Sequence, residues 1–249
     1  MNHSDKYKTQ FSIAEGMLKN FKDLPKLSIH ELSERCYVSP SSMTRFVRQI
    51  GFSSYKEFRQ RCKESFTIDI DYSRTVTKAE GEDILPIYRS YSDNVKDNIQ
   101  YNFEHVDYDQ MSRISEWIYE ASEVVYLGLE FATILGQHYQ IKMAECNKYV
   151  QLPINHNDQI NTIRNLSKKS VVIIASVEGS YFFINEDIIK ELKKKEVKII
   201  AITMEHNLKR LRDVDDIILC NKYNSETEGR ISLLHILELL LMNYFINYK

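Results

Sequence analysis

The feature that most constrains the fold is an alternation of short apolar runs with helix-length segments, which begins at Glu123 and continues to residue 246. Consecutive apolar residues, as in the run that starts at Val171, are typical of a strand covered on both faces. We predict strands over 124–128, 149–152, 171–176, 197–203 and 216–220, helices over 132–146, 158–168, 182–195 and 207–213, and a last helix over 229–246. The alternation therefore predicts a doubly wound α/β domain built on a parallel sheet.

The N-terminal segment, residues 5–66, shows helical periodicity only. Ser28 and Glu31 have the spacing of a capping box, and Ser39 followed by a proline predicts a second helix start. Another start is predicted at Ser54, where Glu57 closes a further box. Apolar pairs occupy the staple positions at the first two starts: Leu27 with Leu32, and Val38 with Met43. These signals predict an all-α N-terminal domain.

Between these two patterns lies a polar stretch with no clear period, residues 67–80, which we interpret as a linker. Helices are predicted over 82–104 and 108–121. The expected organisation is an all-α helix-turn-helix domain over 1–66, the linker, and an α/β doubly wound domain over 81–249.

The net charge of −2 conceals a difference between these parts. Residues 1–66 hold 12 Lys and Arg against 7 Asp and Glu, a balance of +5. The remaining residues hold 21 bases against 28 acids, a balance of −7. Such an asymmetry indicates a basic binding module joined to an acidic body.

Two short helices joined by a tight turn predict a helix-turn-helix, with the turn at residues 37–39. Helical spacing directs one face of the second helix to the core, namely Met43, Phe46, Val47 and Ile50. The opposite face begins with small hydroxyl residues and becomes cationic, which suits a recognition helix in the major groove of DNA. We expect Arg45 to contact a guanine, Ser41 and Thr44 to reach bases or phosphates, and Arg48, Tyr55 and Lys56 to hold phosphates. The full predicted DNA-binding set is Ser39, Ser41, Ser42, Thr44, Arg45, Arg48, Tyr55 and Lys56.

The residues that carry a family resemblance lie in the same segment, 27–64. They are Leu32, Val38-Ser39-Pro40, Thr44-Arg45-Phe46, Gly51-Phe52, Tyr55 and Glu57-Phe58. On these residues the segment resembles the N-terminal domain of RpiR-type transcriptional regulators. In that family a sugar isomerase (SIS) domain follows, a doubly wound fold that usually senses a phosphosugar. The resemblance in order and length covers nearly the whole chain.

The resemblance also implies a phosphate site on the loops after two strands of the SIS domain. The family's first loop resembles Gly-x-Gly-x-Ser, where this chain has Gly128-Leu129-Glu130-Phe131-Ala132. The second resembles Ser-x-Ser-Gly-x-Thr, where this chain has Ser176-Val177-Glu178-Gly179-Ser180-Tyr181. The predicted ligand-binding residues are Gly128, Glu130, Ser176, Glu178, Gly179 and Ser180.

The two glutamates in these loops change what the site is expected to bind. If both carboxylates point inward, they repel a phosphate, and the ordinary phosphosugar site is impaired. Three alternatives remain open: the serines and the helix start near Tyr181 still hold a phosphate, the site takes a ligand with hydroxyls or an amine, or the domain binds no ligand and only dimerises. An equally simple interpretation is that the carboxylates of Glu130 and Glu178 face water on surface loops and have no role in binding.

The sequence as a whole predicts a cytoplasmic, DNA-binding transcriptional regulator of sugar or amino-sugar metabolism genes. We expect a homodimer or higher homo-oligomer on a near-palindromic operator, with a sugar phosphate or related effector. A phosphosugar isomerase-like enzyme and a ligand-free interaction module are the alternatives. No membrane segment, cofactor, metal site or catalytic residue is predicted. His138 with Glu145, or either of them with Glu178, would be the acid–base pair of an isomerase, but no sequence spacing supports such a pairing.

Overall fold

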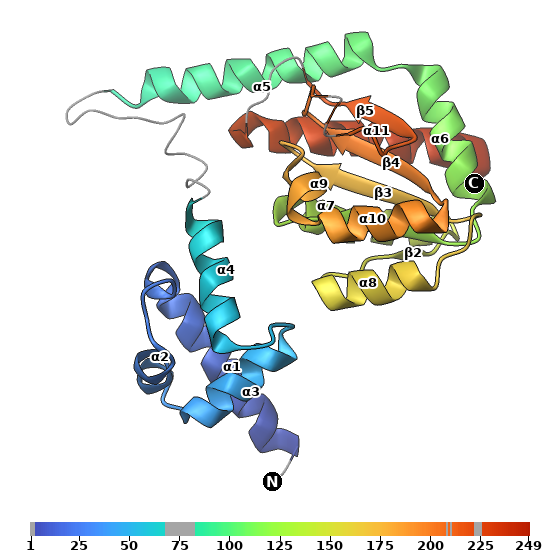
Figure 1. Cartoon of the computed structure of the whole chain (residues 1–249). Helices are drawn as coiled ribbons and strands as arrows, with labels where there is room; N and C mark the ends of the chain where they lie inside the picture. Colours follow the sequence, from blue (N-terminus) through green and yellow to red (C-terminus); the bar gives the residue numbers. More distant parts are fainter. Residues whose placement is uncertain (1–2, 68–82, 208, 210, 222–225) are drawn as a thin grey trace. The chain divides into compact units, whose positions relative to one another are not determined.

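The computed structural model describes residues 3–67, 83–207, 209, 211–221 and 226–249 (Figure 1). The chain divides into two compact units, Met1–Arg74 and Thr75–Lys249. Each unit has its own hydrophobic core. The linker predicted at residues 67–80 lies almost entirely outside the described residues.

The N-terminal unit is all-helical, as predicted. Its elements are α1 (His3–Lys19), the 3-10 helix η1 (Phe21–Asp23), α2 (Ile29–Arg35), α3 (Pro40–Gln49) and α4 (Tyr55–Thr67). α3 packs against α1, α2 and α4. Leu32, Met43 and Val47 are fully buried where these helices meet, so the predicted inner face of α3 forms part of the core.

The predicted helix caps in this unit are confirmed. The Glu31 backbone N–H donates to Ser28 Oγ over 3.2 Å, and the Ser28 N–H donates back to the Glu31 carboxylate over 2.7 Å. Because Ser28 supplies these hydrogen bonds, the pKa of Glu31 is held below its ordinary value. At the start of α4, the Glu57 N–H donates to Ser54 Oγ as predicted. The Glu57 carboxylate, however, accepts from the N–H of Ser53 rather than that of Ser54, so the predicted box closes one residue earlier.

The C-terminal unit is an α/β domain, as predicted. Its elements are α5 (Leu85–His105), α6 (Tyr108–Glu120), β1 (Val124–Gly128), α7 (Phe131–Glu145), β2 (Val150–Gln151), α8 (His156–Arg164), β3 (Val171–Ser176), α9 (Ser180–Ile184), α10 (Glu186–Lys195), β4 (Lys198–Thr203), β5 (Asp216–Leu219) and α11 (Glu226–Tyr248). The strands form one parallel sheet in the order β2-β1-β3-β4-β5. This arrangement confirms the doubly wound parallel sheet that the apolar runs predict.

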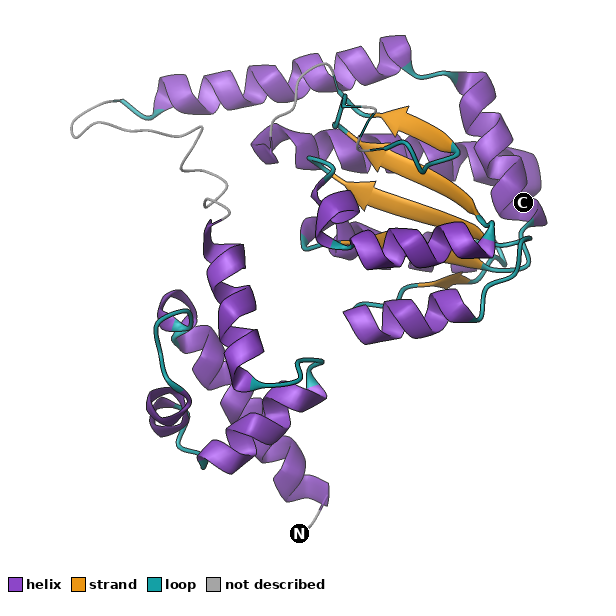
Figure 2. Cartoon of the chain, viewed as in Figure 1, coloured by secondary structure: helices purple, strands orange, loops and turns teal. Residues whose placement is uncertain are grey.

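Helices cover both faces of the sheet (Figure 2). The side chains of β3 show why, because Val171, Ile173 and Ala175 belong to one core cluster, with α6, α7 and α11. Val172 and Ile174 alternate with them and belong to the other cluster, with α8, α9 and α10. A strand with two buried faces needs an apolar residue at every position, which is the pattern seen in the sequence.

Two predicted helices differ from the structure. The helix expected over 182–195 is broken at Asn185, where φ is −115° and ψ is 45°, so α9 and α10 are separate. The helix expected over 207–213 is wrong, because the described residues of that segment form turns and bends. There the side chain of Asn207 accepts from the Lys209 N–H, a local bond that competes with helix formation.

Helix α11 combines a buried side with an exposed one. From Glu228 to Tyr248 it is long and apolar enough to cross a membrane by length and composition alone, a test that core helices of soluble proteins also pass. It packs against α5, α6, α7 and β4 and buries Leu233, Ile236 and Leu240 in the domain core. The predicted last helix is therefore observed, and on its other side Met242, Phe245 and Ile246 are more than half exposed.

Candidate DNA-binding surface and ligand site

The turn between α2 and α3 is tight and unusual in its backbone. Tyr37 adopts φ = 56°, in the left-handed region that non-glycine residues seldom occupy, and its side chain is 96% exposed. The Val38 N–H donates to the Ser33 carbonyl oxygen over 3.0 Å, which closes the turn. Ser39 then caps α3 by accepting from the Ser42 N–H over 3.2 Å, and Pro40 is the first helical residue. These local bonds fix where α3 begins relative to α2.

The inner face of α3 matches the predicted one at three of four positions. Met43 and Val47 are fully buried, and Phe46 packs against the core while partly exposed. Ile50 departs from the prediction, because it is 39% exposed. The helix ends at Gln49, and the backbone of Ile50 at the C-cap no longer continues the helical face.

The outer face of α3 presents the predicted polar and basic residues. Ser41, Arg45 and Arg48 are exposed, and Thr44 is partly buried. The Thr44 hydroxyl donates to the Pro40 carbonyl oxygen over 2.9 Å, so it is engaged within the helix. Arg48 Nε donates to the Ser53 carbonyl oxygen over 3.3 Å, which holds that guanidinium near the loop before α4.

The remaining hydroxyl residues form a small network at the start of α3. Ser39 Oγ lies 2.8 Å from Ser41 Oγ and donates to Ser42 Oγ over 3.0 Å. Arg45 Nη2 lies 3.4 Å from Ser42 Oγ. Arg45 on the exposed face is therefore linked through Ser42 to the capping residue Ser39. Lys56 on α4 is also exposed.

Tyr55 does not fit its predicted role as a phosphate contact. Its side chain is only 9% exposed, and its hydroxyl donates to the Leu27 carbonyl oxygen over 3.1 Å. Burial raises the pKa of this phenol to about 12. Tyr55 therefore packs in the core beside Phe58, and the sequence prediction missed this because a tyrosine suits either environment.

The predicted ligand residues come together at one edge of the sheet. β1 and β3 are neighbours in register, with Gly128 opposite Ala175, so the loops that follow them leave the same edge (Figure 2). β4 continues this edge, since Ser176 is opposite Thr203. Parallel α/β sheets bind ligands at the carboxyl ends of their strands, and we name this region the carboxyl edge.

The loop after β3 is closed by its own hydrogen bonds. Ser176 is buried at 4% exposure, and its Oγ accepts from the Tyr181 N–H over 3.2 Å and lies 3.4 Å from Ser180 Oγ. Gly179 has φ = 71°, a conformation that glycine adopts without strain. Glu178 is partly exposed on this loop. The two serines lie together, as the ligand-site prediction requires.

The loop after β1 carries the other predicted carboxylate. Glu130 is exposed and lies at the N-cap of α7, with φ = 49° and ψ = −114° and no side-chain capping bond. Thr133 Oγ1 donates to the Gly128 carbonyl oxygen over 3.0 Å. A Cβ on Gly128 would lie 2.8 Å from the Ala132 Cβ, so only glycine allows α7 to approach the strand this closely.

Two residues at the carboxyl edge were not predicted. Glu205 follows β4 and is buried, and a Cβ on Gly179 would lie 2.8 Å from the Glu205 Cβ. Its Oε1 accepts from the Asn207 N–H over 2.8 Å. Arg230 on α11 places its guanidinium carbon 5.9 Å from the ring centroid of Phe131, at the start of α7. Extending the carboxyl-end rule to β4 would have found Glu205, whereas no sequence signal marks Arg230.

His138 and Glu145, considered above as an acid–base pair, have other partners in the structure. His138 Nε2 contacts the Glu238 carboxylate of α11, and Glu145 accepts from Lys142 over 3.1 Å. Over the described ranges, no three His, Cys, Asp or Glu residues are arranged to hold a metal ion. Among the described residues, the carboxyl edge offers the hydroxyls of Ser176 and Ser180, loop carboxylates and the Arg230 guanidinium.

Comparison with known proteins agrees with both units. Residues 1–68 match the helix-turn-helix domain of the rpiR family. An uncharacterized HTH-type transcriptional regulator in the aarA 3′ region of Providencia stuartii is 23% identical over 205 residues, which cover 78% of this chain and 69% of that protein.

Solved structures resemble the α/β unit and the chain as a whole. The Vibrio vulnificus NanR protein, complexed with ManNAc-6P, has a TM-score of 0.57 at 15% identity, covering 97% of this chain and 87% of that one. The sugar isomerase domain of an RpiR transcription factor from Sphaerobacter thermophilus has a TM-score of 0.56 at 16% identity, covering 67% and 92%. The α/β unit therefore has the fold of a sugar isomerase domain, and the resemblance in the sequence is confirmed.

Proposed function

We propose that this chain, an RpiR-type transcriptional regulator by its rpiR-family helix-turn-helix domain and its sugar isomerase fold, reads operator DNA with α3 and senses a sugar-derived metabolite at the carboxyl edge. It acts in the cytoplasm, on genes of sugar or amino-sugar metabolism. The observation that carries this proposal is the outer face of α3. There Ser41, Arg45 and Arg48 are exposed on a helix that Ser39 caps and buried side chains hold in place.

The residues of this face take different roles on DNA. Arg45 extends from the middle of α3 and suits bidentate contact with a guanine in the major groove. Arg48, which is hydrogen-bonded to the Ser53 carbonyl oxygen, and Lys56 at the start of α4 suit contacts with phosphates. Ser41 and Ser42, at the first turn of α3, lie where a recognition helix meets base edges.

Pairing of two copies is part of the proposal. A two-fold dimer presents two recognition helices to half-sites about one helical turn, ~34 Å, or multiples of that apart. The operator is therefore expected to be near-palindromic. A metabolite regulates such a dimer only if it binds two arrangements of the chain with different affinity.

The ligand class follows from the chemistry of the carboxyl edge. Ser176 and Ser180 supply hydroxyls, and the solved NanR relative holds a sugar phosphate. Glu130, Glu178 and Glu205 place a carboxylate on each of the loops after β1, β3 and β4, and Arg230 brings a guanidinium near the start of α7. We expect hydroxyl groups to be bound well and a phosphate to be bound more weakly than at a site without these acids.

Binding to DNA is tested by fluorescence anisotropy on the promoter fragment upstream of the chain's own operon. The logarithm of affinity should fall linearly and steeply with the logarithm of salt concentration, because phosphate contacts release counterions. Competition with a scrambled fragment should leave a specific component. Equal affinity for both fragments, or no salt dependence, would reject the regulator and favour an enzyme or an interaction module.

The ligand proposal is tested by thermal shift of the full chain with hexose phosphates, amino sugars and unphosphorylated hexoses. A ligand that binds the folded state raises the melting temperature by several degrees at concentrations far above its Kd. A rise with a phosphorylated or amino sugar supports a sensor. If every sugar leaves the transition unchanged, the α/β unit is an interaction module without a ligand.

A further inference from the structure

Helices α7 and α11, which pack against each other, both expose large apolar side chains. On α11, Met242, Phe245 and Ile246 are each more than half exposed. On α7, Ile134 and Ile141 are exposed to the same degree and lie two helical turns apart, on one face. Exposed apolar side chains that gather on one surface indicate a binding site, and those of α11 gather at a groove.

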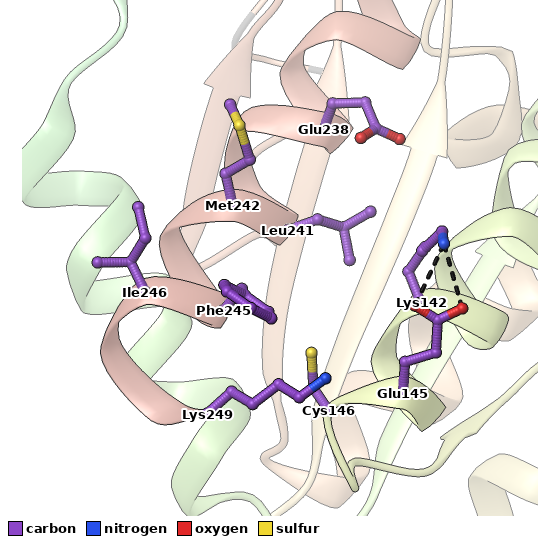
Figure 3. Close-up of a pocket in the computed structure, with 9 residues that line it drawn as sticks. All are labelled: Lys142, Glu145, Cys146, Glu238, Leu241, Met242, Phe245, Ile246 and Lys249. Carbon is purple, nitrogen blue, oxygen red and sulfur yellow. Dashed lines mark hydrogen bonds and ion pairs between the residues drawn. The ribbon is translucent and has the colours of Figure 1, made fainter.

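The groove lies between α11 and the end of α7 (Figure 3). Its volume is about 350 Å³. Leu241 and Phe245 point from α11 toward the end of α7, where Cys146 lies. The part of the groove that α11 lines is therefore largely apolar.

Charged residues of both signs border the groove. Lys142 and Glu145 on α7 form an ion pair with an N–O distance of 3.1 Å. On α11, Glu238 contacts His138, and Lys249 Nζ lies 5.1 Å from the ring centroid of Phe245. The border thus holds two lysines and two glutamates in alternation around an apolar centre, so its charges balance.

We propose that this groove is the surface on which a second copy of the chain docks, in a two-fold dimer of the α/β units. In a two-fold interface the same patch meets itself, so a surface with both charges is complementary to its own copy, whereas a surface of one sign repels it. The apolar centre and charged border match the usual anatomy of such interfaces. This inference rests on the proposed function, which requires paired copies but does not say where they meet.

The location also connects pairing with the candidate ligand site. α7 begins at the carboxyl edge beside Glu130 and ends at the groove. α11 carries Arg230 near the same edge and lines the groove with its last turns. Both helices therefore reach from the ligand site to the dimer surface, and a ligand that shifts either helix alters the geometry of the pair.

The first test measures self-association of the full chain by sedimentation velocity across a concentration series. Ile246→Glu introduces a charge at a position that is 76% exposed, so the fold tolerates it. We expect a dimer for the unsubstituted chain and at least a tenfold weaker dimer for this variant. Ile154→Glu is the matched control, because Ile154 is also mostly exposed and lies outside the groove, and it should remain dimeric.

A charge-swap experiment identifies the partner as a second copy. The pair of changes Lys142→Glu and Lys249→Glu makes one border entirely acidic, and Glu145→Lys with Glu238→Lys makes it entirely basic. Each variant alone should lose dimers, and an equimolar mixture should recover them as heterodimers. Failure of the mixture to associate would overturn the proposal.

The remaining outcomes separate this inference from the proposed function. A dimer that Ile246→Glu leaves intact rejects this surface while paired DNA binding stands. A chain that is monomeric up to 100 µM also rejects it, and stabilisation by decanoate would then assign the groove to an apolar ligand. Absence of DNA binding by an intact dimer would reject the regulator and leave the docking surface in place.

Discussion

The two units build their functional surfaces in opposite ways. In the N-terminal unit, the residues proposed to face DNA come from one continuous segment, 39–56, whose helices begin at local caps. In the α/β unit, the residues at the carboxyl edge come from loops after three strands and from α11, as far apart in sequence as Gly128 and Arg230. The first surface therefore depends on short-range bonds, and the second on sheet topology.

The charges of the two surfaces differ as well. The N-terminal unit presents exposed Arg45, Arg48 and Lys56, which suit a polyanion. At the carboxyl edge, Glu130, Glu178 and Glu205 lie on the loops after β1, β3 and β4, and Ser176 and Ser180 lie together. The net charge of −2 is therefore the sum of a basic N-terminal unit and an acidic α/β unit, and it describes neither surface.

The largest expected effect tests whether the two units unfold separately. Met43→Ala and Ile173→Ala each remove a fully buried side chain, from the N-terminal core and the sheet respectively, at a cost of about 2–5 kcal/mol. The chain has one tryptophan, Trp117, in the α/β unit, so its fluorescence reports on that unit alone. In urea, Met43→Ala should lower the midpoint of the helical transition followed by circular dichroism and leave the midpoint of the Trp117 fluorescence transition unchanged. Ile173→Ala should lower the fluorescence midpoint. If Met43→Ala moves the fluorescence transition, the units are coupled.

The next effect concerns the DNA-facing surface. Arg45→Ala should reduce affinity for the operator by about 1–3 kcal/mol and relax preference at one base pair, because a bidentate guanine contact is lost. Fluorescence anisotropy on the operator and on its single-base variants measures both. Arg89→Ala is the control, since Arg89 is an exposed arginine of the α/β unit. A uniform loss of affinity on all sequences would make Arg45 a phosphate contact instead.

The sequence predicts local features more accurately than tertiary ones. Caps at Ser28 and Ser39 are correct because each is decided by residues within three positions. Periodicity does not reveal that Tyr55 points inward. Its hydroxyl donates a hydrogen bond to the carbonyl oxygen of Leu27, 28 residues away in the sequence, which no local pattern contains. The helix predicted over 207–213 is wrong for a reason that is also local. The side chain of Asn207 accepts from the Lys209 N–H, as a capping side chain does, but here the bond stabilises a turn and no helix follows.

The carboxyl edge shows the same limit. The apolar runs predict all five strands of the sheet, so the loops after β1 and β3 are identified correctly. The position of Glu205 beneath Gly179 depends on the order of strands β3 and β4. Arg230 reaches the start of α7 only because α11 packs against that helix. Strand order and helix packing are properties of the folded chain that no short window contains.

A smaller effect is expected at this edge. Glu178→Gln should bind a sugar phosphate about fivefold more tightly than the unsubstituted chain, roughly 1 kcal/mol, because one negative charge near the phosphate is removed. Isothermal titration with a hexose phosphate at two salt concentrations measures the change, which should shrink as salt screens the charge. Glu186→Gln, an exposed change on α10, is the control. If Glu178→Gln binds the sugar phosphate no more tightly than Glu186→Gln does, the Glu178 carboxylate faces away from the ligand.

The smallest effect lies at the amino edge of the sheet, just before β1. The Glu123 carboxylate accepts hydrogen bonds from the hydroxyls of Ser170, Ser122 and Ser167, which hold its pKa below the ordinary value of 4.5. A carboxyl group with a lowered folded-state pKa stabilises the fold above its unfolded pKa, and that contribution disappears as pH falls through the folded value. Glu123→Gln should therefore lower the free energy of unfolding by about 1 kcal/mol at pH 7 and by almost nothing near pH 3.

Urea titrations of the Trp117 fluorescence at the two pH values measure this difference. Glu120→Gln, at the exposed end of α6, removes a nearby carboxylate outside the serine cluster and serves as the control. A Glu123→Gln deficit that is the same at pH 7 and pH 3 would mean that the serines bind the side chain through its shape and not its charge. In that case the negative charge of Glu123 would contribute nothing to the stability of the amino edge, whereas the charge of Glu178 is proposed to affect ligand binding at the carboxyl edge.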